Sequence, residues 1–161
     1  MTKKSIAIRR AKPSDLEYLV KFQQETADYH HSFDKIYNSS KRISKLSIAK
    51  HLLSILSKRT DRVYMLLQDG NIVGFATAHI KKMNPVFSLS KMGHIGTVYI
   101  EKKYRKSGLG TLAINESMSW FRKNRVKEVD LSVDVKNFSG VTAWKKMGFK
   151  DWRLVIRKRV K

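Results

Sequence analysis

The chain has 161 residues, of which 42% are hydrophobic, and it contains no cysteine. We therefore expect one globular domain over residues 1–161, and disulfide bonds, thiolate metal sites and a cysteine nucleophile are excluded. The formal net charge of +21, from 34 basic and 13 acidic residues, predicts attraction to polyanions such as a phosphate-bearing ligand, nucleic acid or an anionic membrane surface.

The N-terminus and the apolar runs predict a cytoplasmic protein. Residues 1–10 carry charge but lack the apolar stretch of a secretory signal. No apolar run has the length needed to span a bilayer. The absence of cysteine is compatible with a reducing cytoplasm.

Hydrophobic periodicity and turn residues predict the elements of the first half. Ser14 and Glu17 form a capping-box pattern at the start of the first helix, and Asp69-Gly70 is a strong hairpin signal between two strands. The segment 30–40 has no clear period and is expected to be a loop. The expected elements are a strand over 5–10, helices over 14–29 and 41–58, and strands over 62–68 and 71–81.

The second half is predicted to alternate strands and helices. Residues 95–100 form an apolar run typical of a buried strand, and apolar side chains recur at helical spacing soon after it. Gly148 is expected to end a short helix. The expected elements are a strand over 95–100, a helix over 110–124, a strand over 127–135, a helix over 137–147 and a strand over 149–159.

The segment Arg105-Lys106-Ser107-Gly108-Leu109-Gly110 connects the strand over 95–100 to the next helix. The first N–H groups of a helix have no intrahelical partner, and the positive end of the helix dipole lies there. Glycines let the backbone approach a phosphate closely, and basic side chains add charge-assisted hydrogen bonds. This turn is therefore predicted to bind an anion.

The pattern Arg-x-x-Gly-x-Gly after a strand resembles motif A of the GCN5-related N-acetyltransferases, the GNAT superfamily. The segment from Asn137 to Phe149 resembles motif B, in which Asn opens a short helix and Gly-Phe ends it. The resemblance implies an α/β fold, with a central mixed β-sheet flanked by about four helices in the order β-α-α-β-β-β-α-β-α-β. It also implies transfer of acetyl from acetyl-coenzyme A (acetyl-CoA) to a primary amine by direct attack in a ternary complex.

The same resemblance implies a cofactor site shared by the strand, the turn and the short helix. Strand backbone groups would pair with the pantetheine arm, turn amides would hold the pyrophosphate, and Asn137 would reach the cofactor near the pantetheine. A strand N–H near Val98 would stabilise the oxyanion. The cofactor-binding residues implied are Val98, Tyr99, Ile100, Arg105, Lys106, Ser107, Gly108, Leu109, Gly110, Thr111, Asn137 and Trp144.

Position 144 departs from the family pattern. Many GNAT enzymes have a tyrosine seven residues after the motif B asparagine, proposed to protonate the leaving thiolate, whereas this chain has Trp144. An indole N–H donates a hydrogen bond but is no general acid near neutrality. We expect Trp144 to shape the channel around the thioester without giving a proton.

His94 is the predicted catalytic base. It lies 11 positions before Arg105, where some GNAT proteins carry a catalytic glutamate. Strand parity with Val98 and Ile100 predicts that all three side chains share one face. A structural role for His94 stays open, and the base would then be His79, His30, His31 or solvent. No His, Asp and Glu set has metal-ligand spacing, so no metal is expected.

An alternative from another class is a basic nucleic-acid- or ribosome-associated binding protein of the same fold, with little or no turnover. The basic residues occur in small groups, and no recognised nucleic-acid-binding motif contains them. The acceptor amine stays open between a small molecule and a protein amino group. No membrane partner is expected, and the oligomeric state is open.

Overall fold

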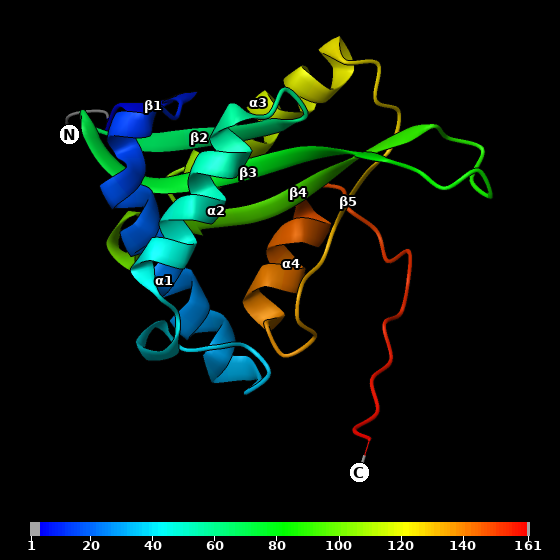
Figure 1. Cartoon of the computed structure of the whole chain (residues 1–161). Coiled ribbons are helices and arrows are strands. Elements are labelled where there is room, and N and C mark those ends of the chain that lie inside the picture. Colours follow the sequence, from blue (N-terminus) through cyan, green and yellow to red (C-terminus); the bar gives the residue numbers. More distant parts are fainter. Residues whose placement is uncertain (1–3, 161) are drawn as a thin grey trace.

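The computed structural model describes residues 4–160, and these contain a five-stranded sheet (Figure 1). The strands are β1 (Ile6–Arg10), β2 (Asp61–Gln68), β3 (Asn71–Lys82), β4 (Lys91–Ile100) and β5 (Val129–Leu131). Neighbouring strands from β1 to β4 are antiparallel, and β5 runs parallel to β4. The predicted α/β fold with a mixed sheet is confirmed.

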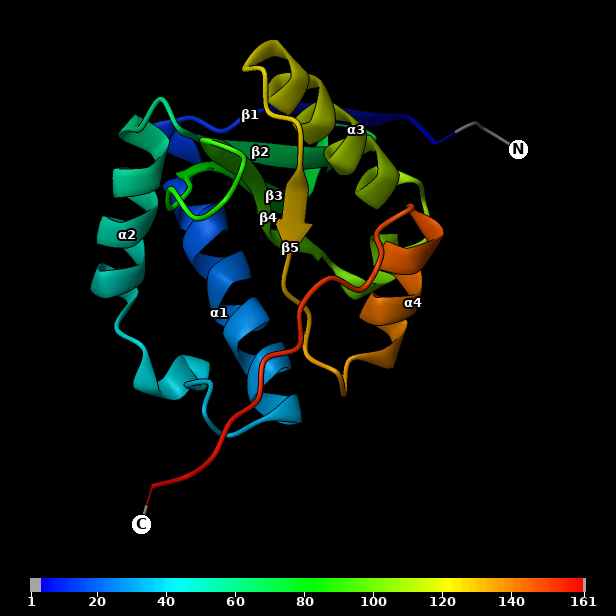
Figure 2. The same cartoon turned by 90° about the vertical axis from the view of Figure 1, so that its right-hand side faces the viewer.

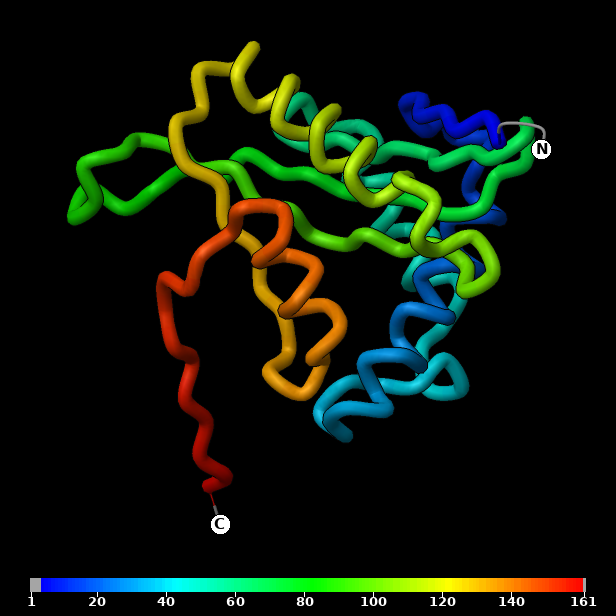
Figure 3. The backbone as a smooth tube through the Cα atoms, turned by 180° about the vertical axis from the view of Figure 1, so that it is seen from behind, coloured from blue at the N-terminus to red at the C-terminus, as the bar shows by residue number. Residues whose placement is uncertain are grey.

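Helices cover both faces of this sheet. Helices α1 (Leu16–Phe33) and α2 (Lys45–Ser57) lie on one face, and α3 (Leu109–Lys123) lies on the other, as the front and back views show (Figures 1 and 3). The short helix α4 (Phe138–Lys146) follows β5. Single 3-10 turns lie at Pro13–Asp15, Ser40–Arg42 and Lys102–Tyr104.

Side chains of β2 point alternately to the two faces of the sheet, and each face has its own hydrophobic core. Val63 and Met65 pack with Phe22 and other side chains of α1 and α2, whereas Tyr64 and Leu66 pack with side chains of α3. Successive strand residues point to opposite faces, so a strand buried on both sides is apolar at every position. This arrangement fixes the sheet between its helices.

Two β-bulges change which side chains share a face. In β3, Val73 is an extra residue opposite the Leu66/Leu67 step of β2. In β4, Gly96 and Thr97 together lie opposite the single residue Thr77 of β3. Each bulge shifts the strand register by one residue, and such a shift reverses the alternation of faces.

Asp15 is the N-cap residue of α1, its carboxylate bonds residues before the helix, and the predicted capping box of Ser14 and Glu17 is wrong. The Asp15 carboxylate accepts hydrogen bonds from both terminal nitrogens of Arg9 and from the backbone N–H of Lys12, each at 2.8 Å. The hydrogen bond from Arg9 is the main cause that lowers the pKa of Asp15 below its ordinary value of 3.8. Because this pKa is depressed in the folded chain, the ion pair stabilises the fold at pH values above the ordinary pKa of aspartate.

We expect Asp15→Asn to lower the free energy of unfolding by about 2 kcal/mol at neutral pH, since it leaves the Arg9 charge unpaired beside a buried site. The difference from the unmodified chain should shrink as the pH falls through the pKa of folded Asp15, where the carboxylate becomes protonated. Urea denaturation, at neutral pH and at a pH below the pKa of folded Asp15, measures this difference in the free energy of unfolding. Asp151→Asn, which removes an ion pair whose carboxylate is 86% exposed, should change little; a pH-independent loss at Asp15 would contradict the prediction.

Several predicted boundaries are wrong. Helix α1 continues to Phe33 into the expected loop, α2 begins at Lys45, β4 begins at Lys91, and β5 is confined to Val129–Leu131. The expected last strand over 149–159 does not form, and its apolar side chains after Phe149 are exposed. Apolar alternation is a local pattern, whereas a strand also needs a partner edge. Within residues 4–160, no strand pairs with this segment.

Met1 to Lys3, at the start of the N-terminus predicted to lack a secretory signal, and Lys161 lie outside the described residues. Within the described range, the helices are too short or too polar to cross a membrane.

Candidate active site

Among residues 4–160, no strand pairs with the outer edge of β4 over its last residues, and this stretch is called the free edge. Pairing with β5 ends at Ile95 and Leu131, and β5 then leads into the segment before α4 (Figure 2). On the edge that faces β3, the Glu101 N–H donates to the Val73 carbonyl at 2.9 Å. Glu101 and Val73 therefore form a hydrogen-bonded antiparallel pair. Such pairs alternate with non-bonded ones, so the backbone groups of Val98 and Ile100 point away from β3. They face the free edge.

This alternation corrects the expectation for Tyr99. Its backbone groups point toward β3, opposite Phe75, and are not free to pair with a ligand at the outer edge. Its side chain lies on the α1 face, where the hydroxyl donates to Glu25. Burial and this hydrogen bond both raise the pKa of Tyr99.

The turn after β4 presents free backbone amides. Lys106 and Gly108 have φ values of 60° and 91°, and Gly108 is the N-cap of α3. Among the described residues, none accepts a hydrogen bond from the backbone N–H groups of Lys106, Ser107 or Gly108. The first helical bond runs from the Leu112 N–H to the Gly108 carbonyl, so the preceding helical amides have no intrahelical acceptor. The geometry fits an anion.

The residues at the turn also fit a phosphate-bearing chain that continues along β4. A Cβ built on Gly110 would lie 3.8 Å from Met147 Cε and 3.9 Å from Ile100 Cδ1, so this glycine faces the space between the end of β4 and α4. Arg105 is exposed, and its Nε donates to the free-edge carbonyl of Ile100 at 2.9 Å. The Leu109 side chain is fully buried, which leaves only its backbone for a ligand.

Asn137 caps α4 and also contacts α1. Its Oδ1 accepts hydrogen bonds from the Gly140 N–H and from the Tyr29 hydroxyl, both at 3.0 Å. The Arg105 guanidinium lies 5.8 Å from the centre of the Tyr29 ring. Tyr29 therefore connects the turn and α4, and the sequence pattern gave no signal for it. Contact of Asn137 with a cofactor stays a prediction.

Trp144 packs against the Phe149 ring at 5.7 Å and lies beside the core cluster that includes Ile95. Val98 contacts the same cluster. Trp144 is half-buried, so part of it stays accessible beside the core. This placement agrees with a role in shaping the space next to the β4 edge.

The expected shared face of His94, Val98 and Ile100 is wrong. The bulge at Gly96 and Thr97 lies between them, and Val98 and Ile100 pack toward α3. His94 lies on the opposite face, opposite His79 of β3. The extra residue in β4 reverses the parity on which the expectation was based.

His94 is held by Asp130. The two side chains are adjacent on β4 and β5, and His94 Nδ1 lies 2.6 Å from Asp130 Oδ1. Lys81 Nζ also donates to this carboxylate, at 3.1 Å. Burial raises the pKa of Asp130, but the hydrogen bonds from His94 and Lys81 outweigh it and hold that pKa below its ordinary value. An ionised carboxylate only accepts, so Nδ1 carries the proton and Nε2 of neutral His94 is a free acceptor.

The other histidines are placed differently. His30 and His31 lie near the end of α1, where His30 packs on Tyr37 and His31 Nδ1 bonds the Tyr37 carbonyl. Burial lowers the pKa of His30. His79 lies beside His94, with ring centres 6.2 Å apart. No group of acidic and histidine residues suited to a metal ion occurs within residues 4–160.

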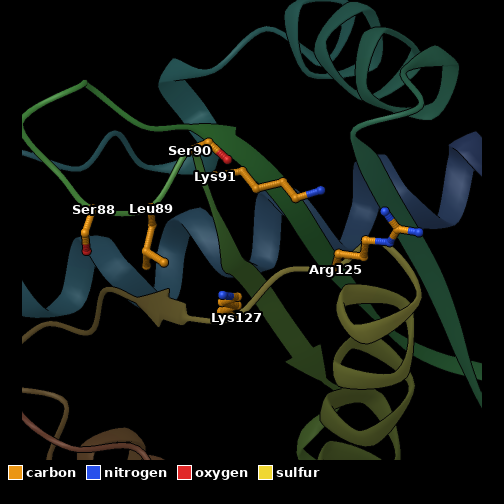
Figure 4. Close-up of a pocket in the computed structure, with 6 residues that line it drawn as sticks. All are labelled: Ser88, Leu89, Ser90, Lys91, Arg125 and Lys127. Carbon is orange, nitrogen blue, oxygen red and sulfur yellow. The ribbon is translucent and has the colours of Figure 1, made fainter.

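A separate small pocket of about 130 Å³ lies at the other end of β4 (Figure 4). Lys91, Arg125 and Lys127 line it together with residues 88–90. It shares no residue with the turn at 105–111. Its basic lining could hold a phosphate group of a separate ligand.

Known proteins resemble this chain in sequence and in fold. An N-alpha-acetyltransferase of Sulfurisphaera tokodaii is 29% identical over 92 residues, which cover 54% of this chain and 55% of that protein. The chain spans only 55 to 64% of the first curated relatives it matches.

Solved structures share the fold at low sequence identity. The BH1408 protein of Bacillus halodurans, as a tetramutant, superposes with a TM-score of 0.84 at 14% identity, covering 96% of this chain and 99% of that one. An aminoglycoside N-acetyltransferase, AAC(6')-Iy in complex with CoA, gives 0.79 at 16% identity, covering 98% and 96%. The model of the Acetyltransferase (GNAT) family matches residues 21–149. With most of its length matched by this model, the chain belongs to the GNAT acetyltransferase family.

Proposed function

We propose that this protein transfers an acetyl group from acetyl-CoA to a primary amine by direct attack in a ternary complex. The observation that carries the proposal is the free edge of β4, which ends at a turn of free backbone amides. The pantetheine arm contains amide groups that can pair with Val98 and Ile100 as a neighbouring strand would. The turn at residues 106–111 would hold the pyrophosphate.

The family and the relatives support an amine as the acceptor. The S. tokodaii relative is an N-alpha-acetyltransferase, and the CoA-bound neighbour is an aminoglycoside N-acetyltransferase. Both names specify acetylation at nitrogen. We therefore propose that the acceptor of this chain is also a primary amine, either of a small molecule or of a protein amino group.

The residues divide the chemistry in the following way. Acetyl-CoA supplies an acetyl thioester whose carbonyl carbon the amine attacks while the thiol departs. The Val98 N–H, which faces the free edge, would donate to the oxygen that gains negative charge, leaving the Val98 carbonyl and the Ile100 groups for the pantetheine. His94, with Nε2 free, accepts a proton from the amine. Trp144 limits the space around the reacting groups.

The test is mass spectrometry of the purified protein for bound CoA, followed by an amine panel with release of the CoA thiol as the signal. The panel should contain peptides with a free N-terminus, polyamines, lysine peptides and aminoglycosides. We expect release with at least one amine. No CoA binding and no release with any amine would overturn the proposal.

Replacing Trp144 tests whether its N–H takes part in catalysis. We expect Trp144→Phe to retain most of the turnover, because a ring of similar shape still limits the site, and Trp144→Ala mainly to raise KM. Steady-state kinetics at varied amine concentration separates the two. A large fall in kcat for Trp144→Phe alone would show that the indole N–H is needed.

A second candidate function is polyanion binding, favoured by the basic pocket in Figure 4. Its expected signature is a steep fall in nucleic-acid affinity as salt rises, because such binding releases counterions. Fluorescence titration with RNA and DNA at rising salt measures this. Lys127→Glu together with Arg125→Glu should abolish binding at the pocket, and unchanged affinity would remove this candidate.

A further inference from the structure

A second histidine–aspartate pair lies beside His94. His79 on β3 is opposite Asp61 on β2, and its Nδ1 lies 3.0 Å from Asp61 Oδ1. The Asp61 side chain is 10% exposed and the His79 side chain 25%, so the carboxylate is buried while the imidazole is accessible. Because a carboxylate accepts only, the contact places the ring proton on Nδ1 and leaves Nε2 as the acceptor.

Nε2 of His79 lies at the bulge in β4. A Cβ built on Gly96 would lie 2.9 Å from this nitrogen and 2.5 Å from Thr77 Oγ1, so only glycine leaves room for the ring here. Thr77 Oγ1 in turn accepts the Thr97 N–H at 2.9 Å and holds the bulge. Nε2 of His79 thus lies against Gly96, two positions before Val98, whose N–H faces the free edge.

The reaction itself moves two protons. An alkylammonium acceptor has three N–H bonds and the amide product has one, so nitrogen loses two protons as its lone pair forms the C–N bond. The C–S bond breaks with its electron pair on sulfur, and one proton ends there; the other goes to solvent. Trp144 cannot supply the sulfur proton, since an indole N–H is not acidic near neutrality.

We propose that His79, held by Asp61, is a further proton-accepting residue of the acetyl-transfer site and acts next to His94. Each imidazole holds one of the two protons that nitrogen loses, and one of these protons passes to the departing sulfur. This inference rests on the proposed function. The charged or titratable groups facing His79 are Asp61 on β2 and His94 on β4, with Asp130 of β5 and Lys81 of β3 behind His94.

The first test measures the protonation of the His79 ring directly and does not depend on enzymatic activity. Long-range proton–nitrogen NMR spectra of the free protein at about pH 8, where histidine is ordinarily neutral, report which ring nitrogen carries the proton. We expect His79 to be protonated at Nδ1 only. A proton on Nε2 would overturn the inference, because that nitrogen could not accept another.

The second test is kinetic. We expect His79→Gln to lower turnover about 10²-fold near neutrality and to recover part of it at high pH, where more of the amine is already neutral. His51→Gln is the matched control, since His51 is exposed on α2, and it should leave turnover unchanged. An acetyl-CoA titration and a circular dichroism spectrum establish that the His79→Gln variant is folded.

The outcomes separate the two proposals. If the unmodified protein acetylates an amine and His79→Gln keeps its turnover and pH profile, His79 is structural and this inference alone fails. If the unmodified protein acetylates none of the amines, the proposed function fails and this inference fails with it.

Discussion

Gly110→Val is expected to lower the affinity for acetyl-CoA at least 10²-fold and to leave the domain folded. The Gly110 amide lies in the first turn of α3, and a side chain there blocks the approach of a phosphate to the backbone. The protein itself tolerates a Cβ at this position, since its nearest neighbours would lie 3.8 Å or more away. Valine is also no worse a helix former than glycine.

Isothermal titration with acetyl-CoA measures the loss, and thermal unfolding checks the fold. Gly108→Val should also abolish binding, but φ at Gly108 is 91°, so strain adds to the effect. Gly70→Val controls for this strain, because Gly70 has φ 79°, lies in the β2–β3 turn and has open space around its Cβ position. Unchanged affinity in Gly110→Val would remove the central claim about the turn.

His94→Gln is expected to lower turnover about 10²-fold near neutrality, the lower end of the usual effect of a general base. Glutamine has a similar size and can still hydrogen-bond Asp130, but it cannot accept the proton. If the proposed acceptor is an alkyl ammonium, it ordinarily titrates near pH ~10, so little neutral amine is present at pH 7. Turnover of the variant should therefore recover in part at high pH.

The measurement is a pH–rate profile of both proteins at saturating acetyl-CoA, with a cofactor titration as the binding control. For the unmodified protein, turnover should rise through the range of about pH 5 to 8 in which histidine ordinarily titrates. A variant with the turnover and profile of the unmodified protein would assign His94 a structural role.

Local patterns in the sequence were sufficient for the family, the order of most elements and the position of the glycine turn before α3. The turn depends on consecutive residues, because glycines and the first amides of a helix act over a few positions. The hairpin at Asp69-Gly70 formed as predicted, since its two turn residues fix the adjacent register. The prediction of a last strand over 149–159 was wrong, because a local apolar pattern cannot supply a neighbouring strand with which to pair.

The tertiary structure alone decided how the histidines are paired. A regular hairpin at Asp69-Gly70 places Asp61 opposite Ala78, but the extra residue Val73 shifts the register and brings Asp61 opposite His79. The bulge at Gly96 and Thr97 places His94 on the same face of the sheet as Asp61 and His79, where Asp130 and His79 are its neighbours. Each bulge adds one residue to one strand and so reverses which side chains share a face. Periodicity along a single segment cannot detect this, because the position of a bulge depends on the strand packed beside it.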